Sequence, residues 1–99
     1  MKYEVDNLYA MFEEYDDEYL KFEDITNPRH RRADLAAFIL LDELVPGKCD
    51  MVSSSAHDQI WLDVDLESLA AVATRDHVIE LIRCGVRLDG ESDSLAMFV

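Results

Sequence analysis

Apolar residues recur at the three- and four-residue spacing of an amphipathic helix in four stretches of the chain. These stretches predict helices over about residues 7–17, 33–44, 66–73 and 75–84. Asp6, Asp65 and Thr74 precede the first, third and fourth stretches. Because such side chains accept hydrogen bonds from a first helical turn, we expect these three residues to be N-caps.

The second of these helices is predicted to be strongly buried, with its charged residues turned outward. Its expected buried positions are Leu35, Phe38, Ile39, Leu41 and Leu44. Asn27-Pro28 is an alternative beginning, because proline suits a first helical turn. The helix should end at Val45-Pro46-Gly47, and Gly85 should end the last helix in the same way.

Three further stretches have the alternation or the composition of β-strands. Residues 59–65 alternate, with Ile60, Leu62 and Val64 on one face. Residues 86–88 and 95–98 flank Asp89-Gly90-Glu91-Ser92-Asp93, so we expect a hairpin there. Residues 19–25 alternate loosely and suggest a short edge strand, whereas residues 48–58 show no periodicity and predict a loop.

This order of elements predicts an α+β fold. We expect a small antiparallel sheet of about three strands, or four, with the helices packed on one face. The chain has 99 residues, 49% of them apolar, so it suits a single domain over residues 1–99 with a real core.

The formal net charge of −13 is unevenly distributed along the chain. Residues 1–26 carry nine acidic and two basic side chains, and residues 49–99 carry ten acidic and three basic ones. Such a surface repels nucleic acids and anionic membranes and attracts basic protein surfaces. We therefore expect a basic protein surface as partner, with no direct nucleic-acid or membrane contact.

Five carboxylates crowd the predicted end of the first helix, where the negative end of the helix dipole disfavours them. So many unfavourably placed carboxylates at one helix end indicate either fraying of the helix or a functional surface. We predict a partner-binding face here, with the two tyrosines as aromatic anchors. Its residues are Glu13, Glu14, Tyr15, Asp16, Asp17, Glu18 and Tyr19.

Between the acidic blocks lies the basic run Arg29-His30-Arg31-Arg32. Four residues make a poor nucleic-acid patch, since affinity scales with the number of phosphates neutralised. We expect these side chains to act as an intramolecular clamp against residues 13–18 or a helix dipole. The alternative is a specificity spot inside an acidic interface.

Two acidic patterns resemble fragments of a calcium-binding loop. Asp63-x-Asp65-x-Glu67 lacks the glycine and the bidentate glutamate that complete such a loop. The residues from Asp89 to Asp93 are those of an ordinary hairpin turn. We therefore predict no metal and no cofactor.

Catalytic patterns are equally weak. Ser53, Ser54 and Ser55 precede His57-Asp58, but there is no G-x-S-x-G nucleophile turn. The three histidines form no i, i+4 metal pair. We predict no catalytic residue and no enzyme.

The two cysteines, Cys49 and Cys84, belong to no C-x-x-C pair, and the first residues lack the charged and apolar regions of a signal peptide. No apolar run approaches the roughly 20 residues of a membrane span. We therefore expect a soluble cytoplasmic protein with two reduced thiols.

Three segments resemble small acidic proteins encoded by phages and prophages, which are mostly uncharacterised. They lie in about the C-terminal two-thirds of the chain and are Pro28-Arg29-His30-Arg31-Arg32-Ala33-Asp34-Leu35, Arg83-Cys84-Gly85-Val86-Arg87-Leu88 and Asp93-Ser94-Leu95-Ala96-Met97-Phe98. The resemblance brings no functional residues. It implies a phage context, in which small acidic proteins often bind and block a host protein.

The leading hypothesis from the sequence is a non-catalytic nucleic-acid mimic. It would occlude the basic surface of a host nucleic-acid-binding protein, such as a restriction or CRISPR component. The alternative is a self-associating structural or accessory domain whose acidity serves only solubility, which leaves a homo-oligomer open.

Overall fold

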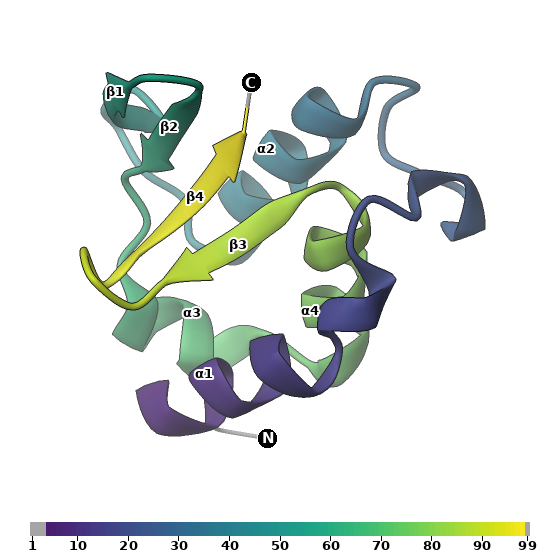
Figure 1. The fold of residues 1–99 in the computed structure, drawn as a ribbon, viewed down its shortest axis with the longest axis horizontal. Coiled ribbons are helices and arrows are strands. Elements are labelled where there is room, and N and C mark those ends of the chain that lie inside the picture. The colour runs from purple at the N-terminus through teal and green to yellow at the C-terminus, as the bar shows by residue number, and fades with distance from the viewer. Residues whose placement is uncertain (1–3, 99) are drawn as a thin grey trace.

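A computed structural model describes residues 4–98 of the chain (Figure 1). It contains the helices α1 (Val5–Glu14), α2 (Ala33–Leu44), α3 (Leu66–Val72) and α4 (Arg75–Arg83). The strands are β1 (Val52–Ala56), β2 (Gln59–Leu62), β3 (Val86–Asp89) and β4 (Ser94–Phe98). Two single-turn 3-10 helices, η1 (Asp16–Glu18) and η2 (Phe22–Asp24), follow α1.

The four strands form one antiparallel sheet in the order β1-β2-β4-β3, and the helices pack on one of its faces. In Figure 1, α2 lies behind β4, while α1, α3 and α4 lie below the sheet. Side chains alternate across the sheet, so Leu62, Val86 and Leu95 point toward the helices. The predicted α+β fold and the predicted hairpin of the last two strands are confirmed.

The fourth strand is not the one that the sequence suggested. Residues 48–58, expected to be a loop, contain β1, which joins β2 through the two-residue turn His57-Asp58. All five residues of β1 are exposed, so neither face imposes an apolar alternation that could reveal the strand. The turn also lacks glycine, although His57 adopts a left-handed φ of 56°.

The edge strand predicted over residues 19–25 is wrong. Leu20 has a left-handed φ of 62°, which interrupts an extended backbone, and η2 follows directly. The partly buried Tyr19, Phe22 and Ile25 pack against the core from this irregular segment. Their spacing of three residues fits successive short turns and not the two-residue alternation of a strand.

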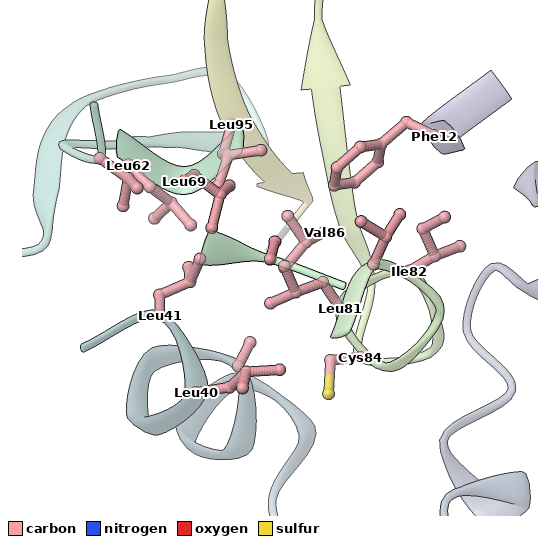
Figure 2. Close-up of a cluster of buried hydrophobic side chains, with 14 of the residues drawn as sticks. Phe12, Leu40, Leu41, Leu62, Leu69, Leu81, Ile82, Cys84, Val86 and Leu95 are labelled. Atoms are coloured by element: carbon pink, nitrogen blue, oxygen red, sulfur yellow. The ribbon is translucent and has the colours of Figure 1, made fainter. Parts of the chain in front are cut away.

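One cluster of buried side chains joins all four helices to the sheet (Figure 2). Its largest fully buried members include Leu40 and Leu41 from α2, Leu69 from α3 and Leu81 from α4. Figure 2 shows Leu81 among labelled side chains of both helices and strands. Burial of this kind stabilises a fold by about 25 cal/mol per Å² of apolar surface.

The bounds of α2 are as predicted, but its buried face differs. Its buried residues are Ala36, Ala37, Leu40 and Leu41, whereas Leu35 and Ile39 are 38% and 37% exposed. The helix is apolar around most of its circumference, so the sequence pattern did not define the inward face. Of the five expected positions, Leu41 is fully buried, and Phe38 and Leu44 are half-buried.

Local capping signals placed three of the helix ends correctly. Asp65 accepts a hydrogen bond from the Ser68 amide (3.3 Å), and Thr74 accepts one from the His77 amide (3.3 Å). Gly85 follows α4 with a left-handed φ of 99°, as a helix stop requires.

The predicted beginning of α1 at Asp6 is wrong. The helix starts at Val5, and the Asn7 side chain accepts a hydrogen bond from the Glu4 amide (3.0 Å). The alternative beginning of α2 at Asn27-Pro28 is also wrong, because Asn27 has a left-handed φ of 55° and α2 starts at Ala33. Within residues 4–98, no helix combines the length and the apolar content needed to cross a membrane.

Candidate partner-binding site

The acidic segment, residues 13–19, begins in the last turn of α1 and continues through η1. The helix predicted to reach residue 17 ends at Glu14, and Asp16, Asp17 and Glu18 form the separate turn η1. These three carboxylates therefore lie just beyond the helix and not in its last turn. Glu13 and Glu14 remain in the last turn, where the helix dipole disfavours them.

Four carboxylates of this segment are exposed: Glu13, Glu14, Asp16 and Asp17. None of them takes part in an ion pair within residues 4–98. We refer to these four side chains as the acidic face. Glu18 differs from them, because its carboxylate accepts from Arg83 Nε at 2.9 Å and both side chains are about three-quarters buried.

The two predicted aromatic anchors are only partly exposed. Tyr15 and Tyr19 both pack against the hydrophobic core, which limits the ring area that either could offer to a partner. Tyr19 also lines a cleft together with Glu13 and Asp16. The structure thus brings three of the seven predicted residues to one concave site and places the other four outside it.

The cleft lies between the acidic segment and β3 and has a volume of about 550 Å³. We call it the α1–β3 cleft. One wall comes from α1 and the residues after it, the other from the end of α4, β3 and the following turn. Its lining residues are Tyr9, Phe12, Glu13, Asp16, Tyr19, Ile82, Val86, Arg87, Leu88 and Gly90.

The cleft opens along the free edge of β3. Val86 and Leu88 point to the helical face of the sheet and Arg87 to the opposite face, yet all three line the cleft. Residues of opposite faces can share one cleft only at the strand edge. Within residues 4–98, β3 pairs in the sheet with β4 alone, so its other edge has backbone groups without a partner in the sheet ladder.

Polar contacts on either side of the acidic segment hold it to the opposite wall. The Tyr9 hydroxyl donates to Asp93 at 2.6 Å, which ties α1 to the turn after β3. This hydrogen bond raises the pKa of Tyr9 to about 12, so the phenol keeps its proton throughout the neutral range. At the other end, the Leu20 amide donates to the Ile82 carbonyl (3.2 Å), next to the Glu18–Arg83 pair.

Arg87 lines the cleft, but its charged group is held on the outer face of the sheet. Its guanidinium carbon lies 4.1 Å from the centroid of the Phe98 ring, and its Nη2 donates to Gln59. This stacking is a cation–π contact, worth about 0.5–1 kcal/mol at an exposed site. Arg87 therefore does not neutralise Glu13 and Asp16, the two carboxylates of the cleft.

The basic run forms a clamp, but not with the partners that the sequence suggested. Arg29 pairs with Glu43 of α2 and with Glu80 of α4, so it joins these two helices. These contacts raise the pKa of Arg29, the Glu43 hydrogen bond most of all. Residues 13–18 instead receive a cation from α4, through the Glu18–Arg83 pair.

The acidic patterns that resembled calcium loops are used by the fold itself. Asp65 caps α3 and also accepts from the Ser68 hydroxyl (2.6 Å), which lowers its pKa. The Asp89 carboxylate accepts from Trp61 Nε1 (3.0 Å) and from the Ser92 hydroxyl (2.9 Å), and these hydrogen bonds lower its pKa too. Among residues 4–98, no group of three or more His, Cys, Asp or Glu side chains is placed to hold a metal ion.

Two histidines serve turns and caps. His77 Nδ1 accepts from the Thr74 amide (3.0 Å), which completes the reciprocal cap of α4. His30 Nδ1 accepts from the Arg32 amide (3.1 Å). Ser53 donates to the Trp61 carbonyl (3.1 Å), so the serine run belongs to the β1–β2 pairing.

The two cysteines should differ sharply in reactivity. Both are free, but Cys49 is exposed and Cys84 is buried, and burial raises the pKa of Cys84 to about 12. Because the thiolate is the reactive form, we expect iodoacetamide at about pH 8 to modify Cys49 alone in the native chain. Mass spectrometry should show one adduct in buffer and two in urea. Two adducts in buffer at equal rates would contradict the burial of Cys84.

Sequence reasoning did not assign seven of the ten residues that line the cleft to a site. Phe12 was recognised only as an apolar helix position, and Val86 and Leu88 only as strand residues. No sequence signal places the edge of β3 beside α1, because the two are joined only by tertiary packing.

Comparisons with protein-family models, with curated proteins and with solved structures find no match to this chain.

Proposed function

We propose that this chain is a non-catalytic protein-binding module that uses its acidic face to occupy a basic surface of a partner protein. The observation that carries the proposal is the state of Glu13, Glu14, Asp16 and Asp17. All four are exposed and lie within five consecutive residues, and none has an ion-pair partner within residues 4–98. A surface of uncompensated carboxylates is available to an external cation.

The spacing of these charges suits competition with nucleic acid. Four carboxylates within five residues present anionic oxygens to the same Lys and Arg side chains that bind phosphates. The net charge of −13 accelerates the encounter with such a surface and suppresses binding to acidic ones. We therefore propose as partner the nucleic-acid-binding surface of a host protein, as in a restriction or CRISPR complex.

A displacement assay tests this function. Purified restriction and CRISPR effector proteins are each loaded with a fluorescently labelled oligonucleotide, and fluorescence anisotropy follows its release. We expect the wild-type chain to displace the oligonucleotide from at least one of them. The variant Glu13→Gln/Glu14→Gln/Asp16→Asn/Asp17→Asn should do so about tenfold more weakly or worse, because each lost charge removes a fraction of the attraction.

A matched control separates the acidic face from net charge. Asp42→Asn/Asp50→Asn/Asp63→Asn/Asp76→Asn removes four exposed charges elsewhere, and none of these side chains makes an ion pair within residues 4–98. This control variant should retain most of the affinity of the wild type.

Raising NaCl from about 50 mM to about 500 mM should weaken the binding of the wild-type chain at least about tenfold, since added salt shortens the Debye length and screens the attraction. No displacement at low salt, or equal affinities of the two variants, would refute the proposal.

A further inference from the structure

We propose that the α1–β3 cleft binds an arginine side chain of the basic partner and thereby anchors the acidic face at a defined position. The inference rests on the proposed function, because it specifies what that face recognises. A volume of about 550 Å³ lies within the usual range of ligand pockets, about 300–1,000 Å³. The cleft can therefore receive a long side chain together with part of the main chain that carries it.

The lining of the cleft suits the methylene stem of such a side chain. The half-buried Leu88 provides apolar surface in this lining, whereas Phe12 and Val86 are only 8% and 1% exposed and add little to it. Long cationic side chains bury their stems along surfaces of this kind while the charged group stays near water. An aliphatic or aromatic side chain could use the same surface, so the charge at the cleft decides between them.

Two carboxylates and two phenol rings supply the recognition of a cation. Glu13 and Asp16 line the cleft, are exposed, and have no ion-pair partner within residues 4–98. The half-buried rings of Tyr9 and Tyr19 belong to the same lining. A planar guanidinium can stack on such rings and bind carboxylates through two parallel hydrogen bonds, whereas an ammonium cannot do both. This combination favours arginine over lysine.

Arg87, the arginine of the cleft lining, does not itself pair with these carboxylates. The head of Arg87 is held over Phe98 and bound to Gln59, so the stem of Arg87 lines the cleft without its charge entering the carboxylate pair. The unpaired edge of β3 also offers backbone hydrogen-bonding groups along the cleft. The best occupant is therefore an extended segment with one arginine directed between the walls.

The cleft is preorganised, which lowers the cost of binding. The Tyr9–Asp93 hydrogen bond and the Glu18–Arg83 ion pair fix the two ends of the wall that carries Glu13 and Asp16. A site whose walls are held in the free protein loses less conformational entropy when it is occupied.

The test uses the full chain, labelled with ¹⁵N, and the peptide acetyl-Thr-Val-Arg-Val-Thr-amide. We expect the amide resonances of residues 9–19 and 82–90 to shift, with a dissociation constant on the order of 1 mM. Replacing the arginine by citrulline keeps the shape and removes the charge. It should weaken binding at least about threefold, the size expected for one partly exposed charged contact.

Two double variants decide whether the cleft itself is responsible. Glu13→Gln/Asp16→Asn removes the carboxylates of the cleft and should abolish the preference for arginine over citrulline. Glu14→Gln/Asp17→Asn makes the same change in charge on the same segment, outside the lining, and should preserve it. The native spectrum of each variant shows that the fold is intact.

The possible results distinguish this proposal from the proposed function. If no cleft resonance shifts at about 10 mM peptide, or if both double variants lose the preference equally, the arginine site is refuted. In either case the displacement assay can still support the acidic face as a diffuse charge surface. If the variant with all four substitutions in the acidic face displaces oligonucleotides with the same affinity as the wild type, the proposed function itself fails.

Discussion

Replacing Leu81 by alanine is expected to destabilise the folded chain by about 3 kcal/mol, within the range of about 2–5 kcal/mol for buried leucines. Leu81 is fully buried and belongs to the cluster that joins the helices to the sheet (Figure 2). Truncation removes apolar contacts and leaves a cavity that the surrounding side chains fill only in part. Because a domain of this size has a stability of only about 5–15 kcal/mol, the loss should be a large fraction of the total.

Urea denaturation, followed by far-UV circular dichroism, measures this effect as a lower midpoint. The melting temperature should also fall by roughly 12–24 °C, since about 1 kcal/mol corresponds to 4–8 °C in a domain of this size. Leu35→Ala is the matched control, because the same truncation occurs at a helical leucine that is 38% exposed. Its cost should be clearly smaller. Equal shifts in the two variants would contradict the central position of Leu81.

Replacing Gly85 by alanine should be the next most damaging change, at about 2 kcal/mol. Gly85 has a φ of 99°, and side-chain-bearing residues in such conformations cost about 1–3 kcal/mol. Its amide also donates to the Ile82 carbonyl at 2.9 Å, so the conformation is needed to end α4. A Cβ atom at this position would lie 3.0 Å from Leu20 Cδ2, but that flexible side chain can move. The backbone conformation, rather than the contact, should account for most of the loss.

Gly47→Ala provides the comparison for Gly85→Ala in the same urea experiment. A Cβ atom there meets nothing within 4 Å, and Gly47 does not have a left-handed φ. The substitution should be neutral or stabilise the chain by up to about 1 kcal/mol, because it restricts the unfolded state. A loss at Gly85 no larger than at Gly47 would show that α4 does not require this turn.

The acidic segment shows how far a sequence pattern can lead toward a site. The density of carboxylates at residues 13–18 singled out the segment, and their conflict with the helix dipole indicated either fraying or a functional surface. The pattern could not separate Glu18, which pairs with Arg83, from its exposed neighbours. That separation depends on which side chains α4 brings into reach.

For the basic run, too, the sequence indicated the role of the side chains but not the residues that they contact. The sequence indicated an intramolecular role for its cations, and Arg29 has one. The predicted contact with residues 13–18 was wrong, because this acidic block is close to the basic run along the chain but does not contact Arg29 in the folded structure. Packing α2 against α4 brings Glu43 and Glu80 to Arg29, and no local rule describes that arrangement.

The sequence by itself determined the elements whose signals are local: the bounds of α2, the caps Asp65 and Thr74, the stop at Gly85 and the hairpin of β3 and β4. These signals arise from hydrogen bonds and dihedral preferences within a few residues. Only the tertiary structure decided that β1 completes the sheet, that α1 ends before Asp16, and that a cleft joins α1 to β3. Tyr9 and Asp93, which hold that cleft together, are 84 positions apart. Contacts at such separation depend on how the whole core packs, and the apolar pattern of any one segment does not encode them.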